Sequence, residues 1–397
     1  MNTTPSEQTS ATITDPHVKY DNGDTAWLDE NGQFHRDNDL PAYISKDNCR
    51  WWLRHGVPWR DNPNRPHVVY DNGDVAWLDE NDEPHRDNDL PAYISTDTTR
   101  RWFKHGVPWR DEASKPHVEY GNGDVAWLDK HEQLHRDNDL PAYISKNKKR
   151  TWYKNGVPWR DEAHKPHRIF PNGDIVWLDK QGKFHRDNDL PAFISKDERR
   201  SWYKHGIPWR DEANKPHRIL ANGGMAWLDD KQQLHRENDL PAYISKNKTR
   251  TWYKNGIPWR DEAHKPHRTW ANGDMAWLDD KQRFHRENDL PAYISKANQR
   301  TWYKHDVPWR ANPNDPHQEL QDGTLLWLNE DNYPHKEDGL PAIIKPNGDC
   351  LYCTNGYVTA VVTNEELMTE KEKTNRKTND AKANIVSIFS KTLLHYN

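Results

Sequence analysis

The chain has 397 residues, of which 33% are hydrophobic and 30% are charged, and its mean hydropathy of -1.24 is typical of a disordered protein. Disorder is excluded by 21 Trp, 16 Tyr and 7 Phe, which are far too many large rings for an unfolded chain. The net charge of -5 and the pI near 6.5 exclude a strong basic field for nucleic acid or anionic membranes. The chain also lacks an apolar run long enough to cross a bilayer.

Residues 1–15 are polar and lack the basic and apolar stretches of a secretory signal. We expect them to form a disordered lead. Three cysteines, Cys49, Cys350 and Cys353, are too few for a disulfide scaffold in a chain of this length and fit a reducing compartment. The predicted location is therefore the cytoplasm.

A sequence of eight residues, His35 to Ala42 (HRDNDLPA), returns every 50 residues along the chain. Its copies begin at His85, His135 and His185, then with Glu in the third place at His235 and His285, and in a more altered form at His335. Each period divides again into two halves of 25 residues, such as 16–40 and 41–65, with a Trp 11 positions after the leading Pro of each. One half ends in His-Arg and the other in Trp-Arg. Residues 16–362 are therefore predicted to be a repeat array.

Each half is predicted to contain a β-hairpin. Asn22-Gly23 lies between Tyr20 and the apolar 26–28 segment, which is typical of a tight primed turn. A proline about every 25 residues and the lack of helical apolar spacing argue against helices. The predicted fold class is all-β: an elongated, twisted antiparallel sheet of tandem hairpins, with a short C-terminal helix. We expect Trp to stack over Trp from unit to unit, with flanking Arg and Lys along the rings, and Asp37 and Asp39 to accept turn hydrogen bonds or pair with a neighbouring Arg.

The Trp-x-x-x-Gly motif inside a hairpin unit resembles the membrane occupation and recognition nexus (MORN) repeat. The matching pairs are Trp52 with Gly56, Trp102 with Gly106, Trp152 with Gly156, Trp202 with Gly206 and Trp252 with Gly256. The chain has His-Arg or Trp-Arg where MORN units carry a second Gly-x-Gly. We therefore describe its repeat as MORN-like. The resemblance implies a long single-layer sheet and an association with membrane lipids. Arrays of this type also look like those of large DNA viruses and phages.

The C-terminal end departs from the repeat. Residues 363–383 are charged and nearly free of apolar side chains, which predicts a polar linker or a frayed helix. Residues 384–397 place Ile, Val, Phe and Leu at helical spacing and are predicted to form an amphipathic helix. That helix would cover the last sheet edge or dock into the groove of a partner.

Repetition of the polar residues argues against a catalytic site, which is normally unique, so we expect no enzyme activity. His17 and His35 recur in every period, but Arg36 beside His35 would repel a metal ion, so a structural role is predicted. Asp37 to Asp39, together with Asp21 and Asp24, lack the Gly and Glu of a helix-loop-helix calcium site, and Cys350-x-x-Cys353 has no second pair. No cofactor or metal is therefore expected.

The remaining hypothesis is binding through a repeated surface. Pro-Trp-Arg in a linking segment is harder to bury than a mid-strand Trp. The candidate residues are Trp59, Arg60, Trp109, Arg110, Trp159, Arg160, Trp209, Arg210, Trp259, Arg260, Trp309 and Arg310. The predicted function is a non-enzymatic scaffold for protein-protein interaction, a viral structural or host-interacting protein being one form of it. The alternatives are single-stranded nucleic-acid binding, which the charge balance disfavours, and membrane-lipid association, which lacks a basic surplus to support it.

Overall fold

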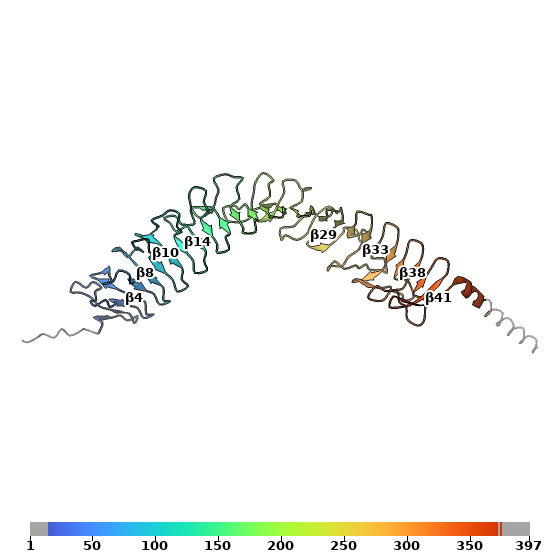
Figure 1. Ribbon diagram of the computed structural model, residues 1–397, viewed down its shortest axis with the longest axis horizontal. Helices are drawn as coiled ribbons and strands as arrows, with labels where there is room; N and C mark the ends of the chain where they lie inside the picture. The colour runs from blue at the N-terminus through green and yellow to red at the C-terminus, as the bar shows by residue number, and fades with distance from the viewer. Residues whose placement is uncertain (1–14, 372–373, 375–397) are drawn as a thin grey trace, which may run out of the picture. The chain divides into compact units, whose positions relative to one another are not determined.

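The structure is a computed structural model that describes residues 15–371 and 374 and divides after Gly206 into two units (Figure 1). Both units are built from short antiparallel strands, which confirms the all-β prediction. One short helix, residues 364–371, follows the last strand. Figure 1 shows that within each unit the strands follow one another in chain order.

The first unit contains a main sheet and a series of small hairpins. The main-sheet strands are β1 (Val18–Lys19), β2 (Thr25–Ala26), β3 (Tyr43–Ile44), β4 (Arg50–Trp51), β7 (Val68–Val69), β8 (Val75–Ala76), β9 (Tyr93–Ile94), β10 (Arg100–Arg101), β13 (Val118–Glu119), β14 (Val125–Ala126), β15 (Tyr143–Ile144), β16 (Arg150–Thr151), β19 (Arg168–Ile169), β20 (Ile175–Val176), β21 (Phe193–Ile194) and β22 (Arg200–Ser201). The strands of the small hairpins are β5 (Leu53–Arg54), β6 (Val57–Pro58), β11 (Phe103–Lys104), β12 (Val107–Pro108), β17 (Tyr153–Lys154), β18 (Val157–Pro158) and β23 (Tyr203–Lys204).

The second unit repeats this arrangement. Its main-sheet strands are β25 (Arg218–Ile219), β26 (Met225–Ala226), β27 (Tyr243–Ile244), β28 (Arg250–Thr251), β31 (Arg268–Thr269), β32 (Met275–Ala276), β33 (Tyr293–Ile294), β34 (Arg300–Thr301), β37 (Gln318–Glu319), β38 (Leu325–Leu326), β39 (Ile343–Ile344), β40 (Cys350–Thr354) and β41 (Tyr357–Val362). The other strands are β24 (Ile207–Pro208), β29 (Tyr253–Lys254), β30 (Ile257–Pro258), β35 (Tyr303–Lys304) and β36 (Val307–Pro308).

Each 25-residue half contains two hairpins rather than the one we predicted. The first hairpin joins the main sheet, where β1 pairs with β2, β2 with β3 and β3 with β4. The second hairpin is shorter: Leu28 bridges Phe34 in one half, and β5 pairs with β6 in the next. Backbone bonds from Gly56 N to Phe34 O and from Arg36 N to Leu53 O link neighbouring second hairpins. The second hairpins therefore form a row beside the main sheet.

The two-residue primed turn lies at a different place from the one we predicted. At Asn22-Gly23 only Gly23 has a positive φ, and Tyr20 N bonds Asp24 O across three loop residues, so the predicted two-residue primed turn is wrong there. That turn occurs instead between β5 and β6, where His55 and Gly56 have φ angles of 50° and 77°. A left-handed first position favours Asn, Asp or His, which accounts for the alternation of His and Asn at this place in the periods.

The buried residues are small side chains and tryptophans. The Ala of each Pro-Ala pair is fully buried, as at Ala42 and Ala142, and its backbone continues the ladder because Trp27 N donates to Ala42 O. Trp27 and Trp152 are only 7% and 6% exposed. The tight fit at the alanines explains why the same residue recurs there.

The loop that follows each His-Arg pair has two successive residues in the left-handed region, Asn138 at φ 58° and Asp139 at φ 53° in one period. In the seventh copy the second of these positions is Gly339, which has the same backbone sign. A β-branched side chain is strained in this conformation.

We expect Asn138→Val to destabilise the first unit by about 1–2 kcal/mol, because Val resists a positive φ. Asn138→Gly should leave stability nearly unchanged. Urea unfolding of the two variants beside the wild type measures the difference. Equal stability of the Val and Gly variants would contradict the backbone explanation.

The chain leaves the last strand through a capped helix. Glu366 N donates to Thr363 Oγ1 at 3.3 Å, and Thr363 N donates to Glu366 Oε2 at 2.8 Å, which is a capping box. This helix lies in the stretch 363–383 that we predicted as a linker or frayed helix. The predicted helix at 384–397 lies outside the described residues. Within the described part of the chain, no helix is long and apolar enough to cross a membrane.

Candidate functional site

The six tryptophans of the Trp-Arg pairs lie on the surface. Their exposed fraction runs from 38% for Trp309 to 50% for Trp59 and Trp109. Trp59 directly follows β6, and its backbone N donates to Trp52 O at 3.1 Å, so the short hairpin sets its position. The same bond recurs from Trp159 to Trp152 at 3.2 Å. Between 38% and 50% of each of these tryptophans is therefore exposed, at an equivalent place in each period.

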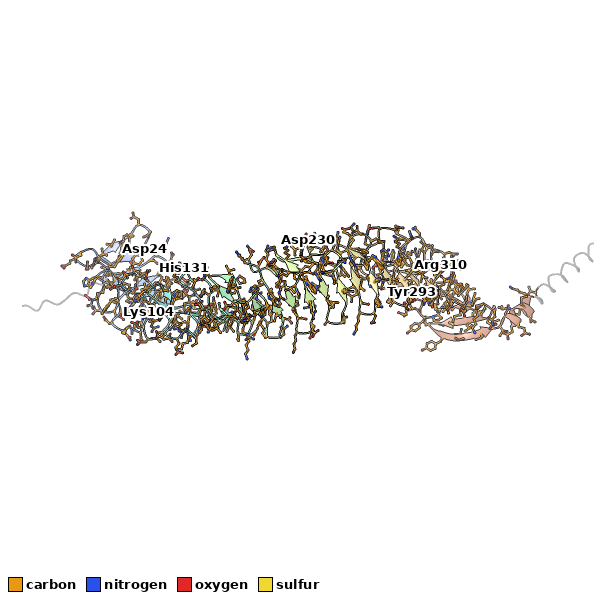
Figure 2. The ribbon with its side chains drawn as sticks, turned by 90° about the horizontal axis from the view of Figure 1, so that it is seen from above. Asp24, Lys104, His131, Asp230, Tyr293 and Arg310 are labelled. Atoms are coloured by element: carbon orange, nitrogen blue, oxygen red, sulfur yellow. The ribbon has the colours of Figure 1, made fainter. Side chains whose placement is uncertain are left out.

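The arginines of these pairs are placed differently, as Arg60 shows. Only 6% of its side chain is exposed, and the guanidinium lies 4.2 Å from the centroid of the Trp52 ring. Its Nε and Nη2 donate to the two carboxylate oxygens of Asp39 at 2.8 and 3.0 Å. Arg110, Arg160, Arg260 and Arg310, the last of which is labelled in Figure 2, make the corresponding contacts. Arg210 donates to Pro216 O at 2.8 Å. These contacts hold the fold together.

The pairing of Asp39 with a neighbouring Arg confirms the expected role of this loop. It also acts on the acid: the hydrogen bonds from Arg160 hold the pKa of Asp139 well below its ordinary value. We expected the Arg and Lys that flank each Trp on its strand to lie along the ring. A cation does lie over the buried Trp, but it comes from the end of the same half. Arg36 lies 3.6 Å from the Trp27 ring centroid, and its Nη1 donates to Pro41 O. The neighbours of Trp27 along the strand do not supply this contact.

At Trp59, Trp159 and Trp259 the exposed indole has a cation and a carboxylate beside it. Lys154 Nζ lies 5.9 Å from the Trp159 ring centroid, and Arg54 occupies the same place at Trp59, 5.6 Å away. The indole Nε1 of Trp159 faces Asp161 Oδ1 at 3.4 Å. The surface around the ring is therefore apolar in its centre and carries both charge signs at its edge.

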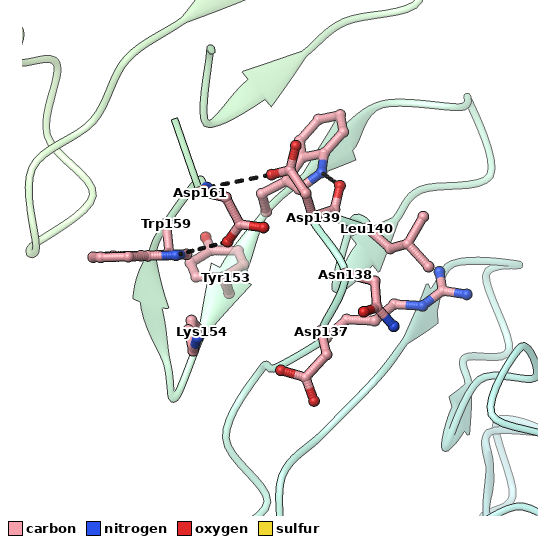
Figure 3. Close-up of a pocket in the computed structure, with 10 residues that line it drawn as sticks. Asp137, Asn138, Asp139, Leu140, Tyr153, Lys154, Trp159 and Asp161 are labelled. Atoms are coloured by element: carbon pink, nitrogen blue, oxygen red, sulfur yellow. Dashed lines mark hydrogen bonds between the residues drawn. The ribbon is translucent and has the colours of Figure 1, made fainter. Parts of the chain in front are cut away.

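A pocket of about 360 Å³ lies between this indole and the preceding loop (Figure 3). Leu140, which is 44% exposed, stands on one side, and Lys154, Trp159 and Asp161 stand on the other. The equivalent residues around Trp259 line a much smaller pocket, of about 10 Å³. The recurring feature is thus the exposed Trp and Leu beside a polar loop, and the pocket volume varies between periods.

The histidines fall into two classes. The His17 class is structural: Nδ1 of His167 accepts the backbone N–H of Leu178 at 2.8 Å, and burial lowers the pKa of His167 to about 4. This ring stays neutral at pH 7 and serves as a hydrogen-bond acceptor.

The His35 class meets a second histidine across the row of small hairpins. The rings of His35 and His55 lie 4.2 Å apart, and His55 Nδ1 lies 2.7 Å from Asp29 Oδ2. That contact holds the pKa of Asp29 below its ordinary value. Where the second residue is Asn155, its Oδ1 contacts His135 Nδ1 instead. No spacing in the sequence pairs these residues, and the one signal for them was the His or Asn that precedes Gly56 and its equivalents.

The other residues we weighed for metal chemistry are held within the fold. Asp24 accepts hydrogen bonds from the Tyr43 hydroxyl and from Lys46 N. Cys350 and Cys353 lie buried on β40 as free thiols, and burial raises the pKa of Cys353.

Comparison of the chain with models of protein families finds no match, and comparison with curated proteins finds none either.

Proposed function

We propose that this chain is a non-enzymatic scaffold that binds a protein partner through its row of exposed tryptophans. The observation that carries the proposal is the recurrence of one half-exposed indole in each period, at the end of the same short hairpin. About half of this large apolar ring does not pack against the fold in each repeat. Exposed apolar surface of this kind marks interaction sites, and Trp is among the residues most enriched at the energetic centres of protein interfaces.

The spacing favours an extended or multivalent partner. Four main-sheet strands per period place successive indoles about 19 Å apart within a unit, at about 4.8 Å per strand. The first unit carries Trp59, Trp109 and Trp159, and the second carries Trp209, Trp259 and Trp309. Several weak contacts at this spacing add up to strong binding when a partner engages them together.

The surroundings favour a protein over nucleic acid. A nucleic-acid surface needs a surplus of cations next to the stacking rings, whereas beside Trp159 the charge of Lys154 is balanced by that of Asp161. The arginine that follows each exposed Trp instead has its guanidinium in an ion pair with the preceding loop, as Arg160 does with Asp139. Leu140 and Asp161 beside Trp159 add apolar area and negative charge, which suit a polypeptide better than a phosphate backbone. Lipid association, which the MORN-like motif implies, ranks third for the same charge reason.

Replacement of all six surface tryptophans by Ala is expected to abolish capture of the native partner and leave the fold intact. The bait is the full chain, and the matched control replaces four exposed lysines in the main-sheet turns, Lys146, Lys196, Lys246 and Lys296, by Ala. Quantitative capture from the native cell measures the proteins that the wild type and the lysine control retain and the Trp variant loses. Identical capture by the Trp variant would refute the proposed surface, and loss of a bound single-stranded nucleic acid in place of a protein would favour the alternative.

A further inference from the structure

We propose that the first unit binds two Zn²⁺-type transition-metal ions, one at Asp29, His35 and His55 and one at Asp79, His85 and His105. Each residue of a cluster offers one ligand atom, and the three atoms lie within 4.8 Å of one another. Two imidazoles and one carboxylate form a ligand set that Zn²⁺ favours, with water completing the tetrahedron. The ion would take the place of the direct contact between His55 Nδ1 and Asp29 Oδ2, and the proton of that contact would be released.

The hydrogen bonds around each cluster already orient its ligand atoms. Asp29 Oδ1 accepts the backbone N–H groups of Asn31 and Gln33, both at 2.9 Å, which directs Oδ2 toward the histidines. His35 Nε2 lies 3.4 Å from Asp37 Oδ1, so a carboxylate stands behind the imidazole. The ligand atom is then Nδ1, and the ion would displace the backbone N–H of His55 that this atom now accepts at 3.3 Å. A carboxylate partner of this kind fixes the tautomer and raises the basicity of a metal-binding histidine.

Burial and charge also suit an ion. The side chains of Asp29 and His35 are 6% and 16% exposed, whereas His55 is 62% exposed and provides the entry path. Arg36, whose charge we took as repulsive, extends over the Trp27 ring and donates to Pro41 O. At the second cluster the carboxylate of Glu83 lies against Gly106, next to His105, and adds negative charge.

Among the residues that the structure describes, clusters with this geometry are found in the first two periods. The stacked rings are tilted by 42° and 35° in the two proposed sites, but only by 24° for His185 with His205 and 17° for His285 with His305. Lone pairs lie in the ring planes, so nearly parallel rings cannot both point at one ion. The later clusters also carry cations: Lys183 lies against Gly206, and Arg283 contacts both Asp279 and His305.

The positive φ that the turn requires does not by itself explain why a histidine stands at position 55. Asn155 has φ 49° at the position where His55 has φ 50°, so Asn satisfies the same backbone conformation. The chain therefore supplies variants that keep the turn and remove the ligand. His55→Asn and His105→Asn each copy a residue found elsewhere in the array, and Gln33→Arg copies Arg283.

Calorimetric titration of the untagged full chain with ZnCl₂ tests the sites. The expected result is two saturable ions per chain, one fewer in His55→Asn or His105→Asn, and none in the double variant. His131→Asn, which removes an exposed imidazole outside the clusters, should retain both ions. Gln33→Arg should lose one ion, and Asp87→Asn should weaken the second site by about 10–100-fold.

The outcomes separate the proposal from its rivals. Zn²⁺ binding that is unchanged in the double variant would overturn it, because the ions would then be held by other histidines. Absence of saturable binding by the wild type would overturn it as well. Mg²⁺ or Ca²⁺ binding equally well would show an oxygen site in place of the nitrogen ligands that we assign.

Discussion

Asp139→Asn is expected to destabilise the first unit by about 3 kcal/mol, because it leaves a buried guanidinium without its counter-charge. Asp139 receives two hydrogen bonds from Arg160, at 2.7 and 2.9 Å, and one from Lys165 at 3.0 Å. The Arg160 side chain is 8% exposed. Asn accepts the left-handed backbone at this position, so the substitution removes charge with little strain. Hydrogen exchange of this loop and urea unfolding measure the loss.

Lowering the pH should remove the stabilisation that the ion pair of Asp139 with Arg160 provides. The pKa of Asp139 is lower in the folded state than its ordinary value of 3.8, so the contribution is complete well above pH 3.8 and is lost as the pH falls through the folded-state pKa. The Asn variant should therefore lose less stability than the wild type between pH 5 and pH 2.

Asp137→Asn is the matched control, because it lies in the same loop with its side chain 71% exposed. Its effect should stay below about 1 kcal/mol. If the two variants lose equal stability, the ion pair with Arg160 is not what holds this loop.

Trp152→Ala should cost about 3–5 kcal/mol, the range for truncating a buried large ring. The indole is 6% exposed, lies 4.2 Å beneath the Arg160 guanidinium and donates from Nε1 to Asp139 O at 2.8 Å. Its loss removes apolar packing, a cation-π contact and the anchor of the loop together. Urea unfolding followed by the fluorescence of the remaining tryptophans gives the free energy.

Trp159→Ala is the comparison, since this indole is 48% exposed. We expect its cost to be within about 1 kcal/mol, because little buried area is lost. Similar losses for Trp152→Ala and Trp159→Ala would mean that the surface ring packs against the fold and is not held available for a partner.

The presence of hairpins could be predicted from the sequence, because turn residues and β-forming segments are local signals. The turn geometry at Asn22-Gly23 was misjudged, since Asn-Gly also suits a three-residue loop with Gly alone at positive φ. The second hairpin of the His-Arg half was missed, because its two sides are only a few residues long, around the bridge between Leu28 and Phe34, and its loop seldom keeps a glycine.

The candidate surface was predicted in part. A linking-segment Trp was expected to be hard to bury, and Trp59 is half exposed. The following Arg60 could not be assigned from adjacency, because its long side chain turns back to Trp52 and Asp39, 8 and 21 residues earlier.

By itself the sequence determined the 50-residue period, its division into halves and the all-β class, since these follow from spacing and from the local preferences of Gly, Pro and aromatic residues. Only the tertiary structure decided which cation covers which indole, that Arg160 is held by Asp139, and that His35 meets His55 and Asp29. Those contacts join residues 8 to 26 positions apart, and they depend on the register between neighbouring hairpins and on the backbone twist at each loop. Two periods with the same motif can therefore differ in ring tilt and nearby charge, which local sequence preferences do not encode.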